Sequence, residues 1–527
     1  MPLNSTRWIT HSFGGGWATD FGPTAYNSPD QNGRMVIPFL VEARNIVYEF
    51  DGGVHKAPGT DNLNSSALES STSAIRGIYD YWRQGTSDSA IQRRVCHVGT
   101  KIKYDQADGT FIDLFTGMSA TSIPQYSTFD DLLIIGSSHN ADLPKSWDGT
   151  TAQNLAGSPP SFSFSIPHKN HQFAAGVFTN PSRLYYSVPL NPEDWTGAGS
   201  GSIDIDPSDG DMITGIVSHK NELIVFKGPN KGSIHRITGS SSSDWARTPF
   251  VTGLPVPWIH SVFKFGDDVG FVTTNGTVHS LKATAAFGDY NQAWLSYPIH
   301  RYMRDNLNHT RARYFTTATD PNRGYVWIGV TPSGQLTNTR YLIMDYRFLS
   351  QNETYPRWSY WDNRAFASVH LVRDFQKPRI FAGGYDGFIY KLEQDARTDN
   401  GSAINMVVET PSMTYGEEWL LKNLADAGVS LNAHNNASLT LTWILDGVSS
   451  FSTTVTQGNT GSVFDTGLFD TAVFGGQTFL PRFFGIENGG DFRAIAYEFS
   501  DTANNVDVEI HSVMTKVTPC GESTENT

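Results

Sequence analysis

An aspartate-rich loop is the clearest candidate for chemistry in this chain of 527 residues. The segment IDIDPSDGDMI (203–213) carries Asp204, Asp206, Asp209 and Asp211. Carboxylate oxygens spaced this closely could hold Ca²⁺. However, no bidentate glutamate follows at the end of the loop, and Asp-Pro and Asp-Gly steps are ordinary turn formers. The sequence therefore favours a turn between strands over a calcium site.

Histidines are the second group that could bind a metal, and fifteen are present. His168 and His171 stand three positions apart in PHKNHQF, whereas His55, His235 and His279 occupy the same position in three similar hairpin motifs. Equivalent placement in repeated hairpins is typical of strand packing. We therefore expect these histidines to pack within the fold and not to form a metal centre.

Motifs of known enzyme classes are missing from the sequence. It contains no H-E-x-x-H, no G-x-S-x-G, no phosphate loop and no S-x-D-x-G-x-x-W loop of the sialidase type. The two cysteines, Cys96 and Cys520, cannot build a disulfide framework or a cysteine-based zinc site. The sequence does not exclude a carboxylate pair for glycoside hydrolysis, because the two members of such a pair need not be neighbours in sequence. We expect no catalytic residue, no cofactor and no metal, and hence no enzyme.

Basic residues cluster only in RQGTSDSAIQRR (83–94) and HRYMRDNLNHTRAR (300–313). Such clusters can contact phosphate, but the pattern favours solvated surface. The net charge is −14, of which −11 falls on residues 401–527. This asymmetry indicates a domain boundary near residue 400 and argues against nucleic-acid affinity in the C-terminal part.

Short hairpin motifs recur along the first four hundred residues. Each has a turn residue, a glycine, a spacer and then apolar residues at near-alternating positions, as in YDGFIYKL (385–392). Asp-Gly and Asn-Gly supply the positive φ of a tight hairpin, and the alternation is that of a half-buried strand. Such units every ~40–55 residues are typical of a β-propeller, here with six to eight blades. The glycines concerned are Gly52, Gly109, Gly149, Gly232, Gly276 and Gly387, with PSGQL (332–336) and NPSRLYYSV (180–188) in the two longer gaps.

The pattern changes beyond the polar segment DARTDNGSA (395–403). SLTLTWILDG (438–447), RAIAYEFSD (493–501) and NVDVEIHSV (505–513) alternate as antiparallel strands of a sandwich do. The sequence thus predicts an all-β protein, an irregular β-propeller followed by a C-terminal β-sandwich. Its expected parts are an extended aromatic arm at 1–45, the propeller at 46–397, the sandwich at 402–517 and a tail at 518–527.

Three segments carry a family resemblance. NIVYEFDGGVHKAPGT (45–60) resembles an early hairpin of tailed-bacteriophage virion proteins, and DPSDGDMITGIVSHKNELIVFKGPNKGSIHRITG (206–239) is similar to a blade of podovirus-type tail nozzle proteins. These are also called tail hub or packaged-DNA stabilisation proteins. FDTGLFDTAVFGG (464–476), followed by the strand RAIAYEF, resembles the C-terminal sandwich of the same group.

The resemblance implies a structural virion protein that forms a homo-oligomeric ring, a hexamer, below the portal and adaptor and beside tail fibre or spike proteins. The ring would close the genome exit channel and conduct double-stranded DNA without reading its sequence. Six copies of the −11 segment would total −66, and an acidic lumen would repel a duplex that bears one charge per about 1.7 Å. Candidate lumen residues are Glu417, Glu418, Asp465, Asp470, Asp491, Asp507 and Glu509.

A second interpretation is a propeller-type tail protein that binds or cleaves a receptor glycan. Trp358, Tyr360 and Trp361 in YPRWSYWD (355–362) would suit a sugar cleft, although so tight a run is more typical of a blade's aromatic core. No stretch approaches the ~18 apolar residues of a membrane span, and no signal peptide begins the sequence. We therefore expect assembly in the bacterial host cytoplasm and residence in the virion tail.

Overall fold

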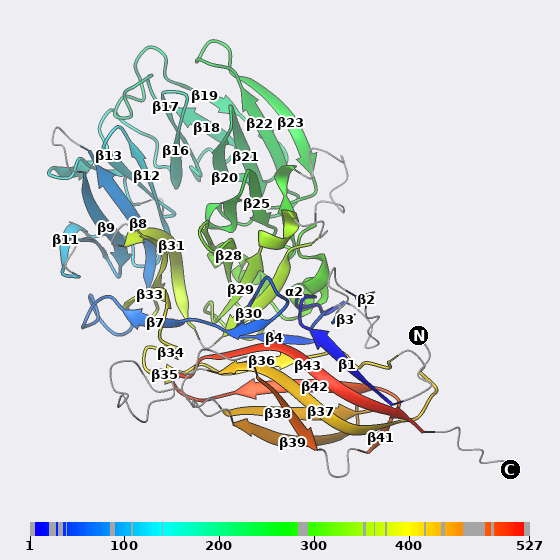
Figure 1. Cartoon of the computed structure of the whole chain (residues 1–527). Coiled ribbons are helices and arrows are strands. Elements are labelled where there is room, and N and C mark those ends of the chain that lie inside the picture. Colours follow the sequence, from blue (N-terminus) through cyan, green and yellow to red (C-terminus); the bar gives the residue numbers. More distant parts are fainter. Residues whose placement is uncertain are drawn as a thin grey trace. The chain divides into compact units, whose positions relative to one another are not determined.

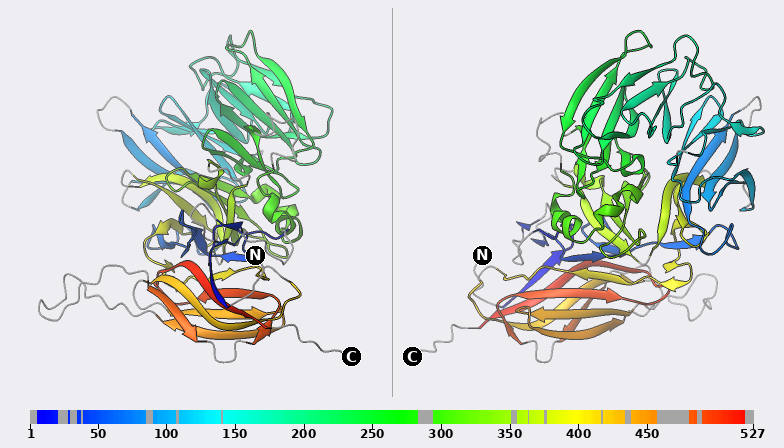
Figure 2. Two further views of the ribbon diagram at one scale, coloured as in Figure 1. Left: turned by 45° about the vertical axis from the view of Figure 1, so that its right-hand side comes forward. Right: turned by 180° about the vertical axis from the view of Figure 1, so that it is seen from behind.

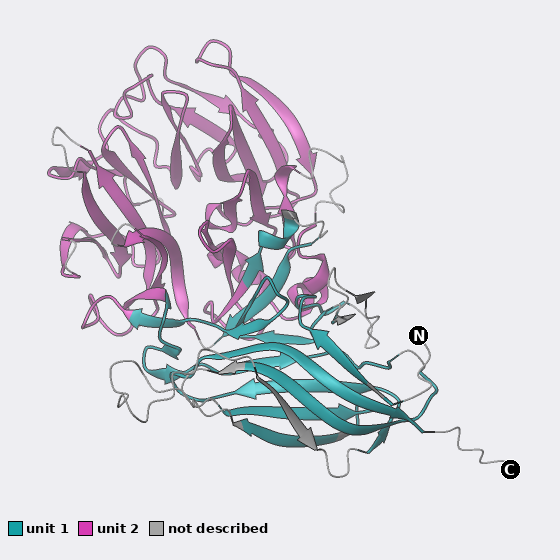
Figure 3. Ribbon diagram, in the orientation of Figure 1, with its two compact units in different colours: residues 1–61, 343–362, 393–527 teal, residues 62–342, 363–392 magenta. Residues whose placement is uncertain are grey.

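The computed structural model forms two compact units (Figure 3). Unit 1 comprises residues 1–61, 343–362 and 393–527, and unit 2 comprises residues 62–342 and 363–392. The residues described are 6–20, 28–29, 35–37, 39–84, 90–106, 109–139, 141–282, 294–350, 355–362, 364–374, 377–415, 418–433, 438–456, 480–485 and 490–520.

Unit 2 is a β-propeller with seven blades in the described part of the chain (Figure 1). Five blades are separate sheets of three or four strands, and the other two, β27-β28-β29 and β31-β32-β33, are parts of larger sheets. The first four blades have four strands each and follow one another along the chain. The first blade contains β8 (Ile75–Arg83), β9 (Ile91–Val98), β10 (Lys101–Asp105) and β11 (Phe111–Thr116), and the second contains β12 (Pro124–Phe129), β13 (Leu132–Ser137), β14 (Lys145–Trp147) and β15 (Ala152–Asn154). The third contains β16 (Phe164–His168), β17 (His171–Ala175), β18 (Arg183–Tyr186) and β19 (Gly201–Asp204). The fourth contains β20 (Met212–His219), β21 (Glu222–Gly228), β22 (Ser233–Thr238) and β23 (Ala246–Thr252).

The last three blades complete the ring. The fifth blade contains β24 (Val262–Phe265), β25 (Asp268–Val272) and β26 (Val278–Ser280). The sixth contains β27 (Thr316–Asp320), β28 (Tyr325–Val330) and β29 (Arg340–Asp345). The seventh contains β31 (Phe366–Asp374), β32 (Lys377–Gly384) and β33 (Ile389–Gln394). Short helices follow the fifth blade, namely η2 (Tyr297–Ile299), α2 (His300–Asp305) and η3 (His309–Tyr314).

The first strand of each blade lies toward a common axis. Among these strands, β8 contacts β12, β12 contacts β16, and β16 contacts β20. The short helix η1 (Ile259–Ser261) contacts β20 and β27 and leads into β24, which also contacts β27. The ring closes because β27 contacts β31, and β31 contacts β8.

The glycine motifs form turns as predicted. Gly109, Gly149, Gly232, Gly276 and Gly387 have φ between 74° and 89°, the left-handed region that glycine adopts without strain. Gly109 and Gly149 join the third and fourth strands of their blades, whereas the other three join the second and third strands. The motif therefore marks different hairpins in different blades, which explains its uneven spacing in the sequence.

Unit 1 is a β-sandwich, and Figure 2 shows its long strands from two further sides. One sheet has the order β2-β3-β1-β43-β37-β40, with β41 on β37, β6 on β43 and β5 on β6. The other contains β30-β4-β36-β42-β38-β39 in this order. Their bounds are β1 (Arg7–Ser12), β2 (Ser28–Pro29), β3 (Met35–Val36), β4 (Glu42–Arg44), β5 (Ile46–Tyr48), β6 (Val54–Lys56), β30 (Arg357–Asp362), β36 (Met406–Glu409), β37 (Lys422–Ala433), β38 (Ser438–Leu445), β39 (Ser449–Thr456), β40 (Leu480–Gly485), β41 (Asp491–Phe492), β42 (Ile495–Asp501) and β43 (Val508–Pro519).

Buried polar contacts join the two sheets of unit 1. Tyr497 on β42 lies with its hydroxyl 2.8 Å from the Thr515 hydroxyl on β43, and Tyr415 donates to the same Thr515 oxygen at 2.9 Å. Lys56 on β6 and Asp501 on β42 form an ion pair of 2.6 Å, and both side chains are fully buried. The sandwich therefore has a core of both apolar and charged residues.

The domain boundaries differ from the expected ones. Residues 46–61 and 343–362 belong to the sandwich and not to the propeller, whose range was expected to be 46–397. The expected arm at 1–45 supplies strand β1, which pairs with β43 from Arg7 opposite Val517 to His11 opposite Val513. The expected linker 395–403 forms a short hairpin of β34 (Thr398–Asp399) and β35 (Ser402–Ala403), and β34 pairs with β7 (Gly59–Asn62).

Long-range strand pairing is the reason for these differences. Residues 42–44 of β4 pair with β36, so the two ends of the chain build one sandwich sheet together. The hairpin of β5 and β6 forms as predicted, with Val47 opposite His55, but its outer strand β6 then pairs with β43. A local pattern specifies the hairpin and not the distant strand that it meets. The expected sandwich at 402–517 is thus incomplete without N-terminal strands, and of the expected tail at 518–527 only residues 518–520 are described.

Candidate functional site

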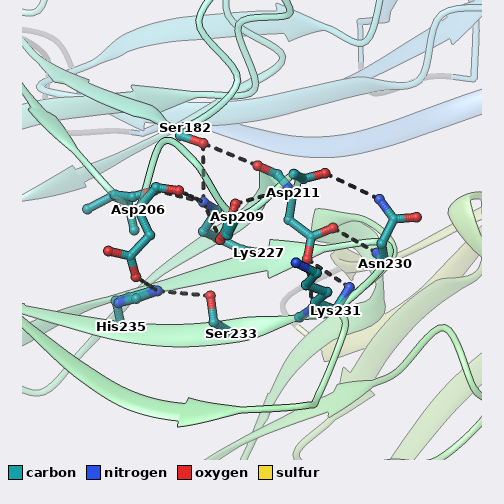
Figure 4. Close-up of polar contacts among 12 residues, drawn as sticks. Ser182, Asp206, Asp209, Asp211, Lys227, Asn230, Lys231, Ser233 and His235 are labelled. Atoms are coloured by element: carbon teal, nitrogen blue, oxygen red, sulfur yellow. Dashed lines mark hydrogen bonds and ion pairs between the residues drawn. The ribbon is translucent and has the colours of Figure 1, made fainter.

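The aspartate-rich loop lies beside a buried lysine in the fourth blade (Figure 4). The ammonium group of Lys227 is fully buried and pairs with the Asp209 carboxylate at 2.7 Å. It also donates to the carbonyl oxygens of Ile205 at 2.7 Å and Asp206 at 2.8 Å, and to the Ser182 hydroxyl at 3.1 Å. A lysine therefore occupies the place among these oxygens that a cation would need.

The other three carboxylates of the loop also have partners. Asp211 accepts hydrogen bonds from the backbone N–H groups of Asn230, Lys231 and Gly232 at 2.7–2.9 Å, which fixes the turn between β21 and β22. Asp204 forms a bidentate pair with Arg183, and Asp206 pairs with Arg247. The Arg247 side chain holds the pKa of Asp206 below its ordinary value, although partial burial opposes this. The predicted turn is what the loop builds.

The predicted packing role of the histidines fits their contacts. His235 and His279 each lie with Nε2 2.9 Å from the hydroxyl two positions earlier, on Ser233 and Thr277. In the third blade, His168 contacts the Ser218 hydroxyl and His171 contacts the Ser187 carbonyl. Across the described ranges, no group of three or more His, Cys, Asp or Glu side chains has the arrangement of a metal site.

The predicted lumen carboxylates have different surroundings in unit 1. Glu418 and Asp491 are exposed. Asp507 pairs with His55 at 2.6 Å and with Arg397 at 2.9 Å, and Glu509 lies 3.4 Å from His511. Burial would raise the pKa of Asp507, but His55 and Arg397 outweigh it and lower the pKa to about 2. Glu417, Asp465, Asp470 and the loop 464–476 lie outside the described residues.

The aromatic run at 355–362 does not rim a cleft. Trp358 and Trp361 are fully buried on β30, and Tyr360 is 5% exposed. The indole N–H of Trp361 donates to the Ile46 carbonyl at 2.9 Å, inside unit 1. These side chains form part of the sandwich core, so the hypothesis of a sugar cleft loses the residues on which it rested.

A cavity of about 240 Å³ lies on the propeller axis. Every blade contributes residues to its lining, mainly from the first strands and from η1 and η3. The polar and aromatic members are Arg76, Tyr79, Gln125, Tyr126, His260, Arg313, Tyr314, Thr316, Thr317, Ser368, His370 and Tyr385.

Rings from three blades lie in contact along one part of the cavity lining. Tyr79 is nearly parallel to Tyr126, with ring centroids 5.5 Å apart, and its ring centroid lies 5.4 Å from that of His370. The Tyr79 hydroxyl lies 3.0 Å from the Thr128 hydroxyl, whereas the buried Tyr126 hydroxyl has no hydrogen-bond partner in the described part of the chain. Burial raises the pKa of both phenols, so both carry their protons at neutral pH.

The two histidines of the cavity are uncharged at neutral pH. Burial lowers the pKa of His260 and of His370 to about 4. His260 Nε2 lies 3.1 Å from the Pro124 carbonyl oxygen, which only accepts, so the proton of this neutral imidazole is on Nε2. The His260 carbonyl in turn accepts from Thr317 at 2.8 Å. With no carboxylate beside them in the lining, these imidazoles do not form the acid–base pair of a hydrolase.

Two guanidinium groups supply the charge of the cavity. Arg313 lies over the Trp258 ring at 4.2 Å from its centroid and near the Phe178 ring at 5.7 Å. Burial lowers its pKa, but an arginine stays protonated at neutral pH. Arg76 donates from Nε to the Ala120 carbonyl at 3.1 Å. The cavity can therefore bind an anion or a polar molecule.

Sequence reasoning did not identify these axial residues. Arg313 belongs to the basic segment 300–313, for which solvated surface was the favoured interpretation, yet its side chain is half-buried at the axis. Tyr79, Tyr126 and His370 come from three first strands that are far apart in the chain. The feature of the sequence that could have identified them is their position in the first strand of a blade, because that strand lines the axis of a propeller.

Comparison with protein-family models and with curated proteins finds no match. Similar solved structures include BBS1N in complex with ARL6DN, with a TM-score of 0.40 and 10% identity over 67% of this chain and 98% of that chain. BamB from Moraxella catarrhalis has a TM-score of 0.36 and 12% identity over 67% and 97% of the two chains. A gluconolactonase from Xanthomonas campestris has a TM-score of 0.33 and 12% identity over 75% and 98%. At these TM-scores the similarities carry no argument about function.

Helices are short throughout the described ranges, and none of them has the length and apolar character needed to cross a membrane.

Proposed function

We propose that this chain is a structural virion protein of a tailed bacteriophage, the subunit of a tail nozzle or hub ring. The ring would be a hexamer that contacts the portal or adaptor and the tail fibre or spike proteins. It would be assembled in the bacterial host cytoplasm and reside in the virion tail. It would close the genome exit channel and later conduct the DNA.

The division of charge between the two units is the observation that carries this proposal. Unit 1 has 27 Asp and Glu against 11 Lys and Arg, a net charge of −16, whereas unit 2 has 25 against 27, a net charge of +2. Acidity therefore belongs to the sandwich, including its N-terminal strands, and not to the chain as a whole. Six sandwiches would bring roughly −96 to a ring, and a negative wall repels the phosphate backbone of passing DNA.

The chemistry of the described side chains supports a role without catalysis. The aspartates of loop 203–213 pair with cations or backbone N–H groups, and the axial cavity holds neutral imidazoles without a carboxylate. We therefore expect the purified protein to hydrolyse neither polysaccharide nor nucleic acid. Turnover that a single carboxylate substitution abolishes would contradict this part of the proposal.

Electron microscopy of the purified chain tests the assembly directly. We expect rings with a central channel, and a preparation that stays monomeric at micromolar concentration and in the presence of portal protein would refute the proposal.

Charge reversal tests the electrostatic part. Glu418→Lys together with Asp491→Lys should keep assembly but slow genome release, more strongly at low salt, where screening is weak.

The matched control is the neutral pair Glu418→Gln and Asp491→Asn, which should have a smaller effect. Both parent side chains are exposed, so neither pair of substitutions should disturb the fold. Genome release that is equally fast for the reversed and neutral variants at low salt would contradict an acidic lumen at these positions.

A further inference from the structure

The axial cavity of unit 2 is positively charged. Its 24 lining residues include Arg76 and Arg313 and no Asp or Glu. A second hollow of the same unit, of about 330 Å³, has the opposite character, because Asp130, Asp131, Asp148 and Glu193 surround Arg83 there. Unit 2 is nearly neutral as a whole, so this separation gives the axis its positive potential.

The charge of Arg313 lacks a carboxylate partner in the part of the chain that the structure describes. Its Nε atom is buried and makes no hydrogen bond there. Its contact with the Trp258 ring compensates for lost hydration in part, since such contacts contribute about 0.5–2 kcal/mol. A partly buried charge without a counter-charge costs free energy. An anion in the cavity would remove that cost.

Aromatic rings lie in the same lining. The Tyr126 hydroxyl is buried without a partner in the described ranges, while its ring stacks on Tyr79. The His370 ring lies beside Tyr79 at a tilt of 46°, so the three rings border the cavity without forming one plane. The Tyr126 hydroxyl has no accessible surface and belongs to the core between the first two blades. A ligand with an aromatic ring and an anionic end matches the rings and the guanidinium groups of the lining.

We propose that the axial cavity binds a small organic acid, with its carboxylate against a guanidinium group of the lining and its aromatic body against the rings of Tyr79, Tyr126 and His370. A cavity of 240 Å³ has the volume of roughly eight water molecules. This suits an acid about the size of benzoate. The proposal concerns unit 2 alone and does not depend on ring assembly.

Titration calorimetry on the full-length protein at pH 7 tests the proposal, with benzoate as the probe and the isosteric neutral amide benzamide as its control. We expect one benzoate site per chain and at least tenfold weaker binding of benzamide. Equal affinity for the two probes, or no benzoate binding by the folded protein, would overturn the proposal. Inorganic phosphate is the third probe, and phosphate binding without benzoate binding would overturn the assignment to an organic acid.

Two variants locate the site. Arg313→Gln should weaken benzoate binding at least tenfold and reduce its dependence on salt, to which Arg76 still contributes. Arg76→Gln removes the other guanidinium group of the lining and should weaken binding at least threefold. Tyr126→Phe keeps the stacked ring and should leave the affinity unchanged, because the hydroxyl has no accessible surface. Lys220→Met, on the exposed surface of the same unit, is the control and should leave the affinity unchanged. If Arg313→Gln does not fold, Arg76→Gln decides alone, and unchanged affinity in that variant would refute the axial site.

Discussion

Replacing Lys227 by methionine should destabilise the propeller strongly. Methionine keeps a chain of similar length in the core but removes the ammonium group, which is fully buried. Four oxygen atoms then lose a donor at once, on Ser182, Ile205, Asp206 and Asp209. The perturbation therefore leaves a carboxylate without its counter-charge and two backbone carbonyls with one donor fewer.

The magnitude follows from these contacts. Removing one partner of a buried ion pair costs about 3–5 kcal/mol. The Asp209 side chain is 25% exposed, so water can hydrate part of the carboxylate, which favours the lower half of that range. Asp209→Asn should cost less, about 1–2 kcal/mol, because the amide oxygen can still accept a hydrogen bond from Lys227.

Urea denaturation followed by tryptophan fluorescence measures the effect. Unit 2 should unfold at a lower urea concentration in Lys227→Met. Lys231→Met is the matched control, because Lys231 lies in the same hairpin with an exposed side chain and should change the free energy of unfolding by less than about 0.5 kcal/mol. Millimolar CaCl₂ should not move the transition of the parent protein.

Two results would refute the reasoning. The first is a Lys227→Met variant within about 1 kcal/mol of the parent, which would mean that the lysine does not hold the loop. The second is stabilisation of the parent by calcium. A cation bound at 100 times its dissociation constant would add about 2.7 kcal/mol, and such a shift would restore the calcium interpretation of loop 203–213.

Three further predictions concern other contacts. Lys56→Met should lower the free energy of unfolding of unit 1 by about 3–5 kcal/mol in urea, and the double variant with Asp501→Leu should recover most of that loss. The pKa of Asp507 is about 2, below its unfolded value, so its contribution of about 1–2 kcal/mol is complete above pH 4 and is lost as the pH falls toward 2. Acid titration of Asp507→Asn should accordingly show a shallower loss of stability. Gly232→Ala should destabilise unit 2 more than Gly334→Ala in thermal unfolding, because a Cβ at Gly232 would lie 2.1 Å from the Pro255 nitrogen, whereas the space at Gly334 is open.

Turn chemistry explains why the propeller was predictable from the sequence. A glycine with positive φ and the alternating strand after it are local properties, and Gly232 and Gly387 show both. The same holds for the strand Ser438–Leu445, where Leu439, Leu441 and Trp443 are buried as the alternation predicts. Each of these features is specified by fewer than ten consecutive residues.

The composition of the sandwich could not be predicted in the same way. Strand β1 meets β43 across some five hundred residues, and β4 meets β36 across more than three hundred and fifty. Nothing in RWITHS (7–12) distinguishes a strand of the C-terminal sheet from the start of an extended arm, because pairing depends on the register of two distant segments. The distribution of charge in the sequence predicted this division in part, because the acidic segment 401–527 belongs to the more acidic unit.

The axial cavity shows a limit of motif reasoning. Its polar residues stand on the first strands of four blades, on η1 and η3 and in the turn after β32, so their separation in sequence reflects blade length and not chemistry. Arg313 is ordinary among the basic residues of 300–313, and only closure of the ring, through the contact of β31 with β8, places it near Tyr126 and His370 in one lining. Turn residues determine where the blades form. The chemistry of the axis depends on which side chains of the first strands face inward. A prediction of function for a propeller should therefore begin from the inner positions of those strands, once the turn motifs have located them.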